Sequence, residues 1–146
     1  ELYEGKLTNT FDTQINKNSL MSIEEVGLKE LLQEASKYYD EDNLQIAVEK
    51  LWDAFERLKT YYCSPTINKK KSVNKIIMDM SNSQDSFIDL FQKEFQELTM
   101  IGNNFRIRHH EITKIDIQDK RHYKYFYRRC LSLISTAIQY LDGSNL

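Results

Sequence analysis

Apolar side chains recur at helical spacing along most of the chain. The clearest series follows the acidic segment 40–43, which suits a helix N-terminus, and it keeps its period for about five turns. Its members are Leu44, Ala47, Val48, Leu51, Phe55, Leu58 and Tyr62. Cys63, Ser64 and Pro65 end the series, because proline biases the residue before it away from helical geometry. The pattern predicts a helix that begins near residue 44 and ends near residue 62.

Three further series predict helices on either side of it. Ser22 and Glu25 have the spacing of a capping box, and the apolar residues that accompany them are Ile23, Val26, Leu31, Ala35 and Tyr38. After the lysine-rich segment 68–72, which we expect to be solvated, a short helix carries Val73, Ile76, Ile77 and Met80. A polar break at 81–83 precedes a helix that carries Phe87, Leu90, Phe91, Leu98 and Ile101, and we expect this helix to end at Gly102.

A last helix is predicted near the C-terminal end of the chain. Its apolar stripe is Tyr123, Phe126, Tyr127, Cys130, Ile134, Ala137, Ile138 and Leu141, and Asp142-Gly143 provides a glycine C-cap. The segment between residues 102 and 118 has loop-like or extended spacing. We therefore expect a helical domain over residues 20–142, with a linker or docked extension at 1–19 and a short tail at 143–146.

The composition agrees with an all-α, up-and-down bundle of four to five helices. The 146 residues fit one domain, and 4 Gly and 1 Pro are too few for the many turns of a β-sandwich. Two cysteines without a CxxC pair indicate a reducing, cytoplasmic location, and no apolar run approaches the roughly 20 residues that cross a bilayer. Because the chain begins with Glu1 rather than Met, we also expect an upstream domain of the same protein.

Charge divides the chain into an acidic and a basic part. Residues 1–58 carry 6 basic and 13 acidic side chains, a net charge of −7, whereas residues 106–129 carry 8 basic and 3 acidic side chains, a net charge of +5. The formal net charge of −2 for the whole chain argues against general polyanion binding. The basic segment could nevertheless contact phosphate groups or an acidic partner.

The segment 103–111 concentrates the residues that could perform chemistry. It holds two of the three histidines with two arginines, two asparagines and a glutamate. Imidazole exchanges protons near neutral pH, and a guanidinium can bind a phosphate through two parallel hydrogen bonds. These groups suit RNA cleavage without a metal ion, in which the 2′-hydroxyl is the nucleophile. The alternative is a polar loop leading into the last helix, whose side chains cap backbone groups and pair with the acidic early helices.

Two segments resemble one known family. Residues 104–111, with Lys114 and the aromatic, basic helix that follows, are similar to the closing motif of HEPN domains, an arginine followed after four to six residues by a histidine. Residues 47–60 resemble HEPN-like domains of abortive-infection (AbiJ-like) and toxin-type bacterial defence proteins. The resemblance covers roughly residues 20–142. It implies a helical homodimer in which two arginine–histidine motifs face each other as a metal-independent endoribonuclease site.

The resemblance also suggests roles for individual residues. Arg106 and His110 match the motif best, with three residues between them; on a helix this spacing would place both side chains on one face. Arg108 and His109 form the reserve pair. In this hypothesis the arginines bind phosphate or stabilise the transition state, a histidine is the acid or base, and Asn104 orients either pair.

Glu94 interrupts the apolar stripe of the fourth predicted helix, between Phe91 and Leu98. Burying its carboxylate would be costly without a partner. One interpretation is that Glu94 orients an arginine or histidine of the motif. The other is that the stripe turns toward Phe95 and leaves Glu94 at a wet edge.

Two further groups of residues lie on helix faces by their spacing. Trp52, Glu56 and Lys59 share a flank that could form a dimer contact, although a half-buried core tryptophan explains the same pattern. Arg121, Lys124 and Arg128 share a face that could bind RNA phosphates or simply be solvated.

We expect no metal site and no cofactor. The candidate ligands His109, His110, His122, Glu111 and Cys130 show no HExxH or comparable spacing. The competing hypothesis for the whole chain is a non-catalytic helical module for interaction or dimerisation.

Overall fold

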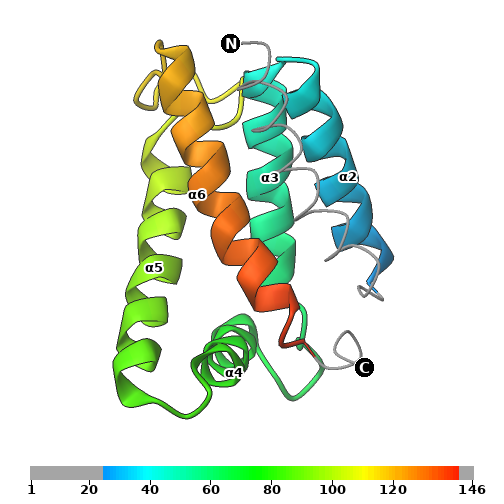
Figure 1. Ribbon diagram of the computed structural model, residues 1–146, viewed down its shortest axis with the longest axis vertical. Helices are drawn as coiled ribbons and strands as arrows, with labels where there is room; N and C mark the ends of the chain where they lie inside the picture. Colours follow the sequence, from blue (N-terminus) through cyan, green and yellow to red (C-terminus); the bar gives the residue numbers. More distant parts are fainter. Residues whose placement is uncertain (1–24, 142–146) are drawn as a thin grey trace, which may run out of the picture.

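The computed structural model describes residues 25–141, in which five helices are connected by loops. The helices are α2 (Val26–Asp40), α3 (Leu44–Lys59), α4 (Lys69–Ser81), α5 (Asp85–Asn104) and α6 (Lys120–Ile138). Four of them run along the long axis of the molecule, and the short α4 lies at its lower end (Figure 1). No strand occurs within these residues, so the prediction of an all-α bundle is confirmed.

Helix α3 lies at the centre of the bundle, with α2 on one side and α6 on the other (Figure 1). Its predicted apolar stripe from Leu44 to Leu58 is buried, and Ala54 and Trp52 are buried with it. The helix ends at Lys59 because Thr60 caps it, with its hydroxyl donating to the carbonyl oxygen of Arg57 at 2.8 Å. Tyr62 therefore lies beyond the helix, and the predicted end near residue 62 is about one turn too late.

The buried face of α2 differs from the predicted one. Val26 is 65% exposed, and the buried residues are Leu28, Leu32, Ala35 and Tyr39. Glu25 is the N-cap itself, because its carboxylate accepts hydrogen bonds from the backbone of Gly27 and Leu28. The predicted capping box, in which Glu25 is the third helical residue, is therefore wrong; Ser22 and Ile23 lie outside the described residues.

Helix α5 buries only the C-terminal part of its predicted stripe, Leu98 and Ile101, together with Phe95. Phe87 and Leu90 are about half exposed, at 45% and 55%, and the buried residues Phe95, Leu98, Ile101 and Gly102 all belong to its second half. The ring of Phe95 packs against Phe55 of α3, with centroids 5.7 Å apart. The helix continues past Gly102 to Asn104, so the predicted end at the glycine was two residues short.

Side chains cap the two remaining helices at their N-termini. The Asn68 side chain accepts from the backbone N–H of Lys71, so α4 includes the lysines that were expected to precede it. Asp119 caps α6 by accepting from the backbone of Arg121, and α6 ends at Ile138. The predicted cap at 142–143 and the predicted boundaries at residues 19 and 142 fall outside the described part of the chain. None of the helices described here is long and apolar enough to cross a bilayer.

Candidate functional site

The loop 105–119 connects α5 to α6 at one end of the bundle and carries both histidines of the predicted motif (Figure 1). Its ends are joined by backbone hydrogen bonds: Ile115 N–H donates to Asn104 at 2.9 Å, and Arg106 N–H donates to Ile115 at 2.7 Å. Ile107 and Ile117 are buried and anchor the loop in the core. Because the segment is a loop, the argument that Arg106 and His110 share a helical face does not apply.

Arg106 folds back onto its own loop. Its Nε and Nη2 atoms both donate to the backbone carbonyl oxygen of His109, at 2.9 and 2.6 Å. Its Nη1 atom lies 3.8 Å from a carboxylate oxygen of Asp116. The guanidinium therefore fixes the turn that carries the two histidines.

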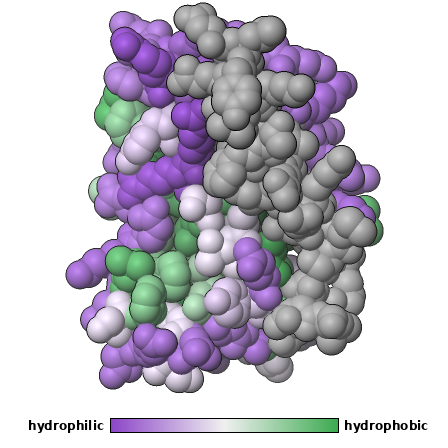
Figure 2. Space-filling view, in the orientation of Figure 1, coloured by the Kyte–Doolittle hydropathy of each residue, from purple (hydrophilic) through white to green (hydrophobic). Residues whose placement is uncertain are grey.

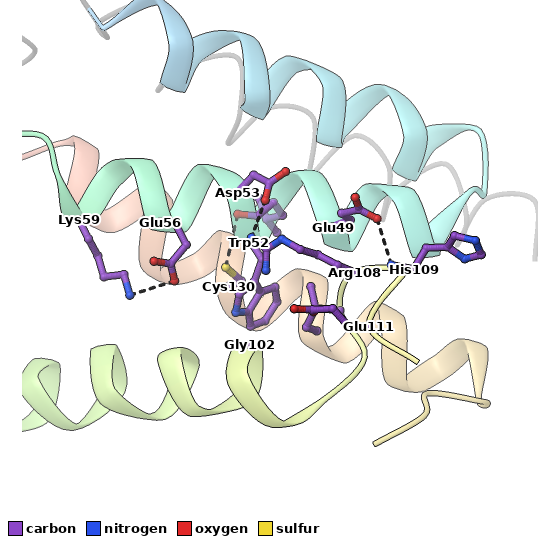
Figure 3. A network of polar contacts seen from close by, with 12 residues as sticks. Glu49, Trp52, Asp53, Glu56, Lys59, Gly102, Arg108, His109, Glu111 and Cys130 are labelled. Atoms are coloured by element: carbon purple, nitrogen blue, oxygen red, sulfur yellow. Dashed lines mark hydrogen bonds and ion pairs between the residues drawn. The ribbon is translucent and has the colours of Figure 1, made fainter. Parts of the chain in front are cut away.

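Arg108 fastens the loop to α3. Its Nη2 atom donates to Oδ1 of Asp53 at 2.5 Å, and the backbone N–H of His109 lies 3.5 Å from Oε1 of Glu49 (Figure 3). Gln45 donates from its side chain to the carbonyl oxygen of Ile107 at 3.3 Å. Three side chains of α3 thus hold three consecutive residues of the loop.

The α3 residues in this contact were not among the predicted site residues. Gln45, Glu49 and Asp53 recur every four residues, so they form a polar stripe beside the apolar stripe of the same helix. Two of the three are acidic, opposite the most basic segment of the chain. That spacing and charge is the signal that could have identified them.

Both imidazoles of the motif lie on the outside of the loop. His109 and His110 are exposed, and the ring of His109 points away from α3 in Figure 3. The loop therefore brings the two predicted histidines together at its surface. The two predicted arginines are half-buried and contact the protein itself.

Glu111 and Lys114 form an ion pair on the inner side of the loop, where Glu111 lies close to Gly102 (Figure 3). Lys114 Nζ lies 2.9 Å from Oε2 of Glu111 and 3.3 Å from the carbonyl oxygen of Gly102. The hydrogen bond from Lys114 lowers the pKa of Glu111, although burial opposes this shift. Oε1 of Glu111 is buried and has no hydrogen-bond partner within the described residues.

Neither predicted orienting residue contacts a motif side chain. Asn104 has an exposed side chain and meets the loop through its backbone carbonyl. Glu94 is half-buried and accepts two hydrogen bonds from Arg129 of α6, both at 3.0 Å. The prediction that Glu94 orients the motif is wrong, because its carboxylate pairs with Arg129 instead. The buried stripe of α5 does pass through Phe95, as the alternative interpretation proposed, but Glu94 is paired rather than at a wet edge.

The flank of α3 predicted as an interface is largely internal. Trp52 is fully buried and donates from its indole N–H to the carbonyl oxygen of Leu98 at 3.0 Å. Lys59 is 5% exposed, lies 3.0 Å from Glu56, and donates to the hydroxyl of Thr99 (Figure 3). Trp52 and Lys59 therefore stabilise the packing of α3 against α5, which contradicts their assignment to a dimer contact.

The predicted basic face of α6 is divided. Arg121 is exposed and folds onto Asp119, with nitrogen–oxygen distances of 3.0 and 3.1 Å. This contact and the backbone hydrogen bond lower the pKa of Asp119 to about 2. Arg121 and Arg128 line a groove between α5 and α6, whereas Lys124 is half-buried and does not line it.

Neither cysteine belongs to a disulfide or a metal site in the part of the chain that the structure describes. Cys63 is exposed. Cys130 is completely buried, and this burial raises the pKa of its thiol. No group of three His, Cys, Asp or Glu side chains among residues 25–141 is placed to hold a metal ion.

Comparison with known proteins adds no relative: no protein-family model, curated protein or solved structure matches this chain.

Proposed function

We propose that this chain is an HEPN-like domain that binds RNA and cleaves it without a metal ion, as a defence protein of the abortive-infection or toxin type. The observation that carries the proposal is the loop 105–119, which is fixed by two arginines and presents two exposed imidazoles at its surface. A rigid loop with exposed proton-exchanging groups suits general acid–base catalysis.

The reaction proposed is transesterification within RNA. One imidazole accepts the proton of a ribose 2′-hydroxyl while the 2′-oxygen bonds to the adjacent phosphorus. The bond from phosphorus to the 5′-oxygen breaks, and a protonated imidazole donates a proton to that oxygen. The products are a 2′,3′-cyclic phosphate and a 5′-hydroxyl, so atoms and charge balance without a further reactant. His109 and His110 are the catalytic residues in this proposal.

The two arginines take different roles. Arg106 is a positioning residue, because two of its nitrogens already hold the carbonyl oxygen of His109. Arg108 uses Nη2 for Asp53, and within the described residues its Nε and Nη1 atoms donate no hydrogen bond. A phosphate at the loop could accept from these donors, which would stabilise the negative charge that grows on it during the reaction.

A second copy of the chain completes the site in this proposal. The base and the acid act on opposite sides of the phosphorus, because the attacking and leaving oxygens lie roughly in line. His109 and His110 are neighbours on one exposed turn, so a second loop facing the first can supply the group on the far side. Any upstream domain of the same protein would then control or deliver this activity.

The test is cleavage of a structured RNA in the presence of EDTA. We expect wild-type protein to produce fragments with cyclic phosphate ends, and we expect His109→Ala or His110→Ala to slow cleavage at least about a hundredfold. Lys37→Ala is the matched control, because Lys37 is an exposed residue of α2 and lies outside the loop. An inactive wild type, or equal rates in wild type and both histidine variants, would refute the proposal.

A second candidate function is supported by the apolar surface of the same loop. Ile112 and Ile115 are 74% and 54% exposed, which is unusual for isoleucine on a polar loop. These side chains favour a non-catalytic interaction module that contacts another protein surface. Light scattering of Ile112→Ser separates the two candidates: loss of a dimer together with loss of cleavage supports the composite site. If the wild type forms a dimer but does not cleave RNA, and Ile112→Ser loses that dimer, the interaction module is supported.

A further inference from the structure

The groove between α5 and α6 has the size of a ligand site. Its volume is about 580 Å³, within the range of pockets that hold small molecules and nucleotides. Phe91 and Glu94 line it from α5, and Arg121, Tyr125, Arg128 and Arg129 are among the residues that line it from α6. In Figure 2 apolar surface gathers over the lower part of α5 and is bordered by hydrophilic surface.

An ion pair joins the two helices that line this groove. Arg129 donates from Nε and Nη2 to the two carboxylate oxygens of Glu94, both at 3.0 Å. Nη1 of the same guanidinium lies 3.5 Å from the hydroxyl of Tyr125. The carboxylate, the guanidinium and the phenol are therefore connected by a continuous series of polar contacts.

The tyrosine ring and one arginine remain available to a ligand. Tyr125 is 56% exposed although its hydroxyl is held, so a large part of its side chain faces solvent. Arg128 is exposed and forms no ion pair within residues 25–141. The charged side chains that line the groove are three arginines and one glutamate, so the lining carries a positive excess.

We propose that this groove binds an unpaired nucleotide of a single-stranded RNA, with the base stacked on Tyr125 and a phosphate held by Arg128. Aromatic rings stack on bases of any sequence, and arginine binds phosphate oxygens through paired donors. A base can stack in this way only when it is unpaired. The inference rests on the proposed function and adds to it that the substrate is single-stranded beside the cleaved bond.

The position of the groove agrees with that role. Arg121, which lines it, is the second residue of α6 and lies two residues after the end of the loop 105–119. Figure 1 shows that α6 descends from this loop beside α5. One end of the groove therefore lies at the end of α6 that the loop joins.

Filter binding tests the inference separately from catalysis. The probe is a labelled oligoadenylate, offered either alone or annealed to oligouridylate, in EDTA and with the His109→Ala/His110→Ala protein so that no RNA is cut. We expect the single strand to bind more tightly than the duplex. Tyr125→Ala should weaken single-strand binding about tenfold, and Tyr125→Phe should retain it, because the ring alone provides the stacking.

Two further variants sharpen the result. Arg128→Ala should weaken binding and reduce its dependence on salt, because one phosphate contact is lost. Tyr140→Ala is the control, since Tyr140 is 40% exposed on the same chain but does not line the groove. Circular dichroism of every variant establishes that it is folded.

Each outcome decides between the two proposals. If the wild type cleaves RNA but Tyr125→Ala and Arg128→Ala bind the single strand as the parent does, the groove inference is overturned and the proposed function stands. If the groove variants lose binding while no protein cleaves RNA, the inference stands and the nuclease proposal falls. If these variants change only the mass in light scattering, the groove is a contact between copies and the inference is overturned.

Discussion

The indole of Trp52 lies directly against the backbone of Gly102, in the last turn of α5. A Cβ at residue 102 would come within 2.8 Å of both Cδ1 and Nε1 of the indole. The ring cannot easily retreat, because it is fully buried and its N–H is bonded to Leu98. This contact explains why glycine stands inside a helix at that position.

Gly102→Ala should therefore lower the free energy of unfolding by about 1–2 kcal/mol. Overpacking against Trp52 costs about 1–3 kcal/mol and outweighs the gain of up to about 1 kcal/mol in helix propensity. Urea unfolding followed by circular dichroism measures the difference. Gly27→Ala is the control: its new Cβ would meet the end of the Arg57 side chain, which is exposed and can move, so the loss should be smaller.

The ion pair between Arg108 and Asp53 should contribute measurably to the attachment of the loop. The two side chains are 25% and 34% exposed, so water screens their interaction only in part. A double-mutant cycle with alanine at both positions should give a coupling energy of about 1 kcal/mol. The same cycle on Lys50 and Glu34, which are more exposed and 3.6 Å apart, should give at most about 0.5 kcal/mol. Equal coupling in both cycles would contradict this view of the loop.

Asp119 should make the protein sensitive to acid. Its pKa is about 2 in the folded chain, below the ordinary value of 3.8, because Arg121 donates hydrogen bonds to it. The unfolded chain therefore binds a proton more readily, and the stabilisation present above about pH 4 is lost as the pH falls through about 2. Asp119→Asn keeps a capping side chain that does not titrate. Urea midpoints should fall more steeply on acidification for the wild type than for Asp119→Asn; parallel curves would contradict the assignment.

Lys59 should make stability depend on pH in the same direction, but in the alkaline range. Burial lowers the pKa of this lysine below 10.5, the ordinary value, so the unfolded chain again binds the proton more readily. The wild type should gain stability relative to Lys59→Met as the pH rises from neutral toward about pH 10. Near neutral pH, Lys59→Met should be at least as stable as wild type, because it retains the packing of the side-chain stem while removing a buried charge. Lys59→Ala loses that packing as well and should be the least stable of the three proteins.

Glu94→Ala should destabilise the contact between α5 and α6. The change leaves the half-buried guanidinium of Arg129 without its carboxylate, at a cost of about 1–2 kcal/mol. Glu97→Ala is the control, because Glu97 is exposed on the same helix and should change stability by less than about 0.5 kcal/mol. Thermal unfolding of the two variants measures the contrast, and equal losses would show that the ion pair contributes little.

The sequence predicted α3 well because its apolar residues fit one helical period without a competing set. In α5 two sets overlap, since Phe87, Leu90 and Phe91 suggest one face and Phe95 suggests another. The ring of Phe55 decides between them, because it packs against Phe95. That choice depends on a residue in a different helix, and no local pattern contains it.

The position of the Arg/His loop could be predicted, whereas its internal contacts could not. Its composition already marked residues 103–111 as unusual. The bond from Arg106 to the carbonyl oxygen of His109 depends on how the loop folds, and side-chain spacing carries no information about backbone acceptors. The role of Asp53 could not be predicted for a related reason. Unless the path of the loop is known, Asp53 is only a polar residue on the flank of a helix.

The two cysteines differ in a way that provides an experimental handle. Cys63 is exposed in the connection between α3 and α4, and Cys130 is buried in the core with its thiol pKa raised. A maleimide reagent should therefore modify the folded chain once, at Cys63, and should reach Cys130 only when the core opens. The fraction of chains that carry a second label then measures how often the core opens. A spin label at Cys63 allows the distance between two copies of the chain to be measured without any substitution.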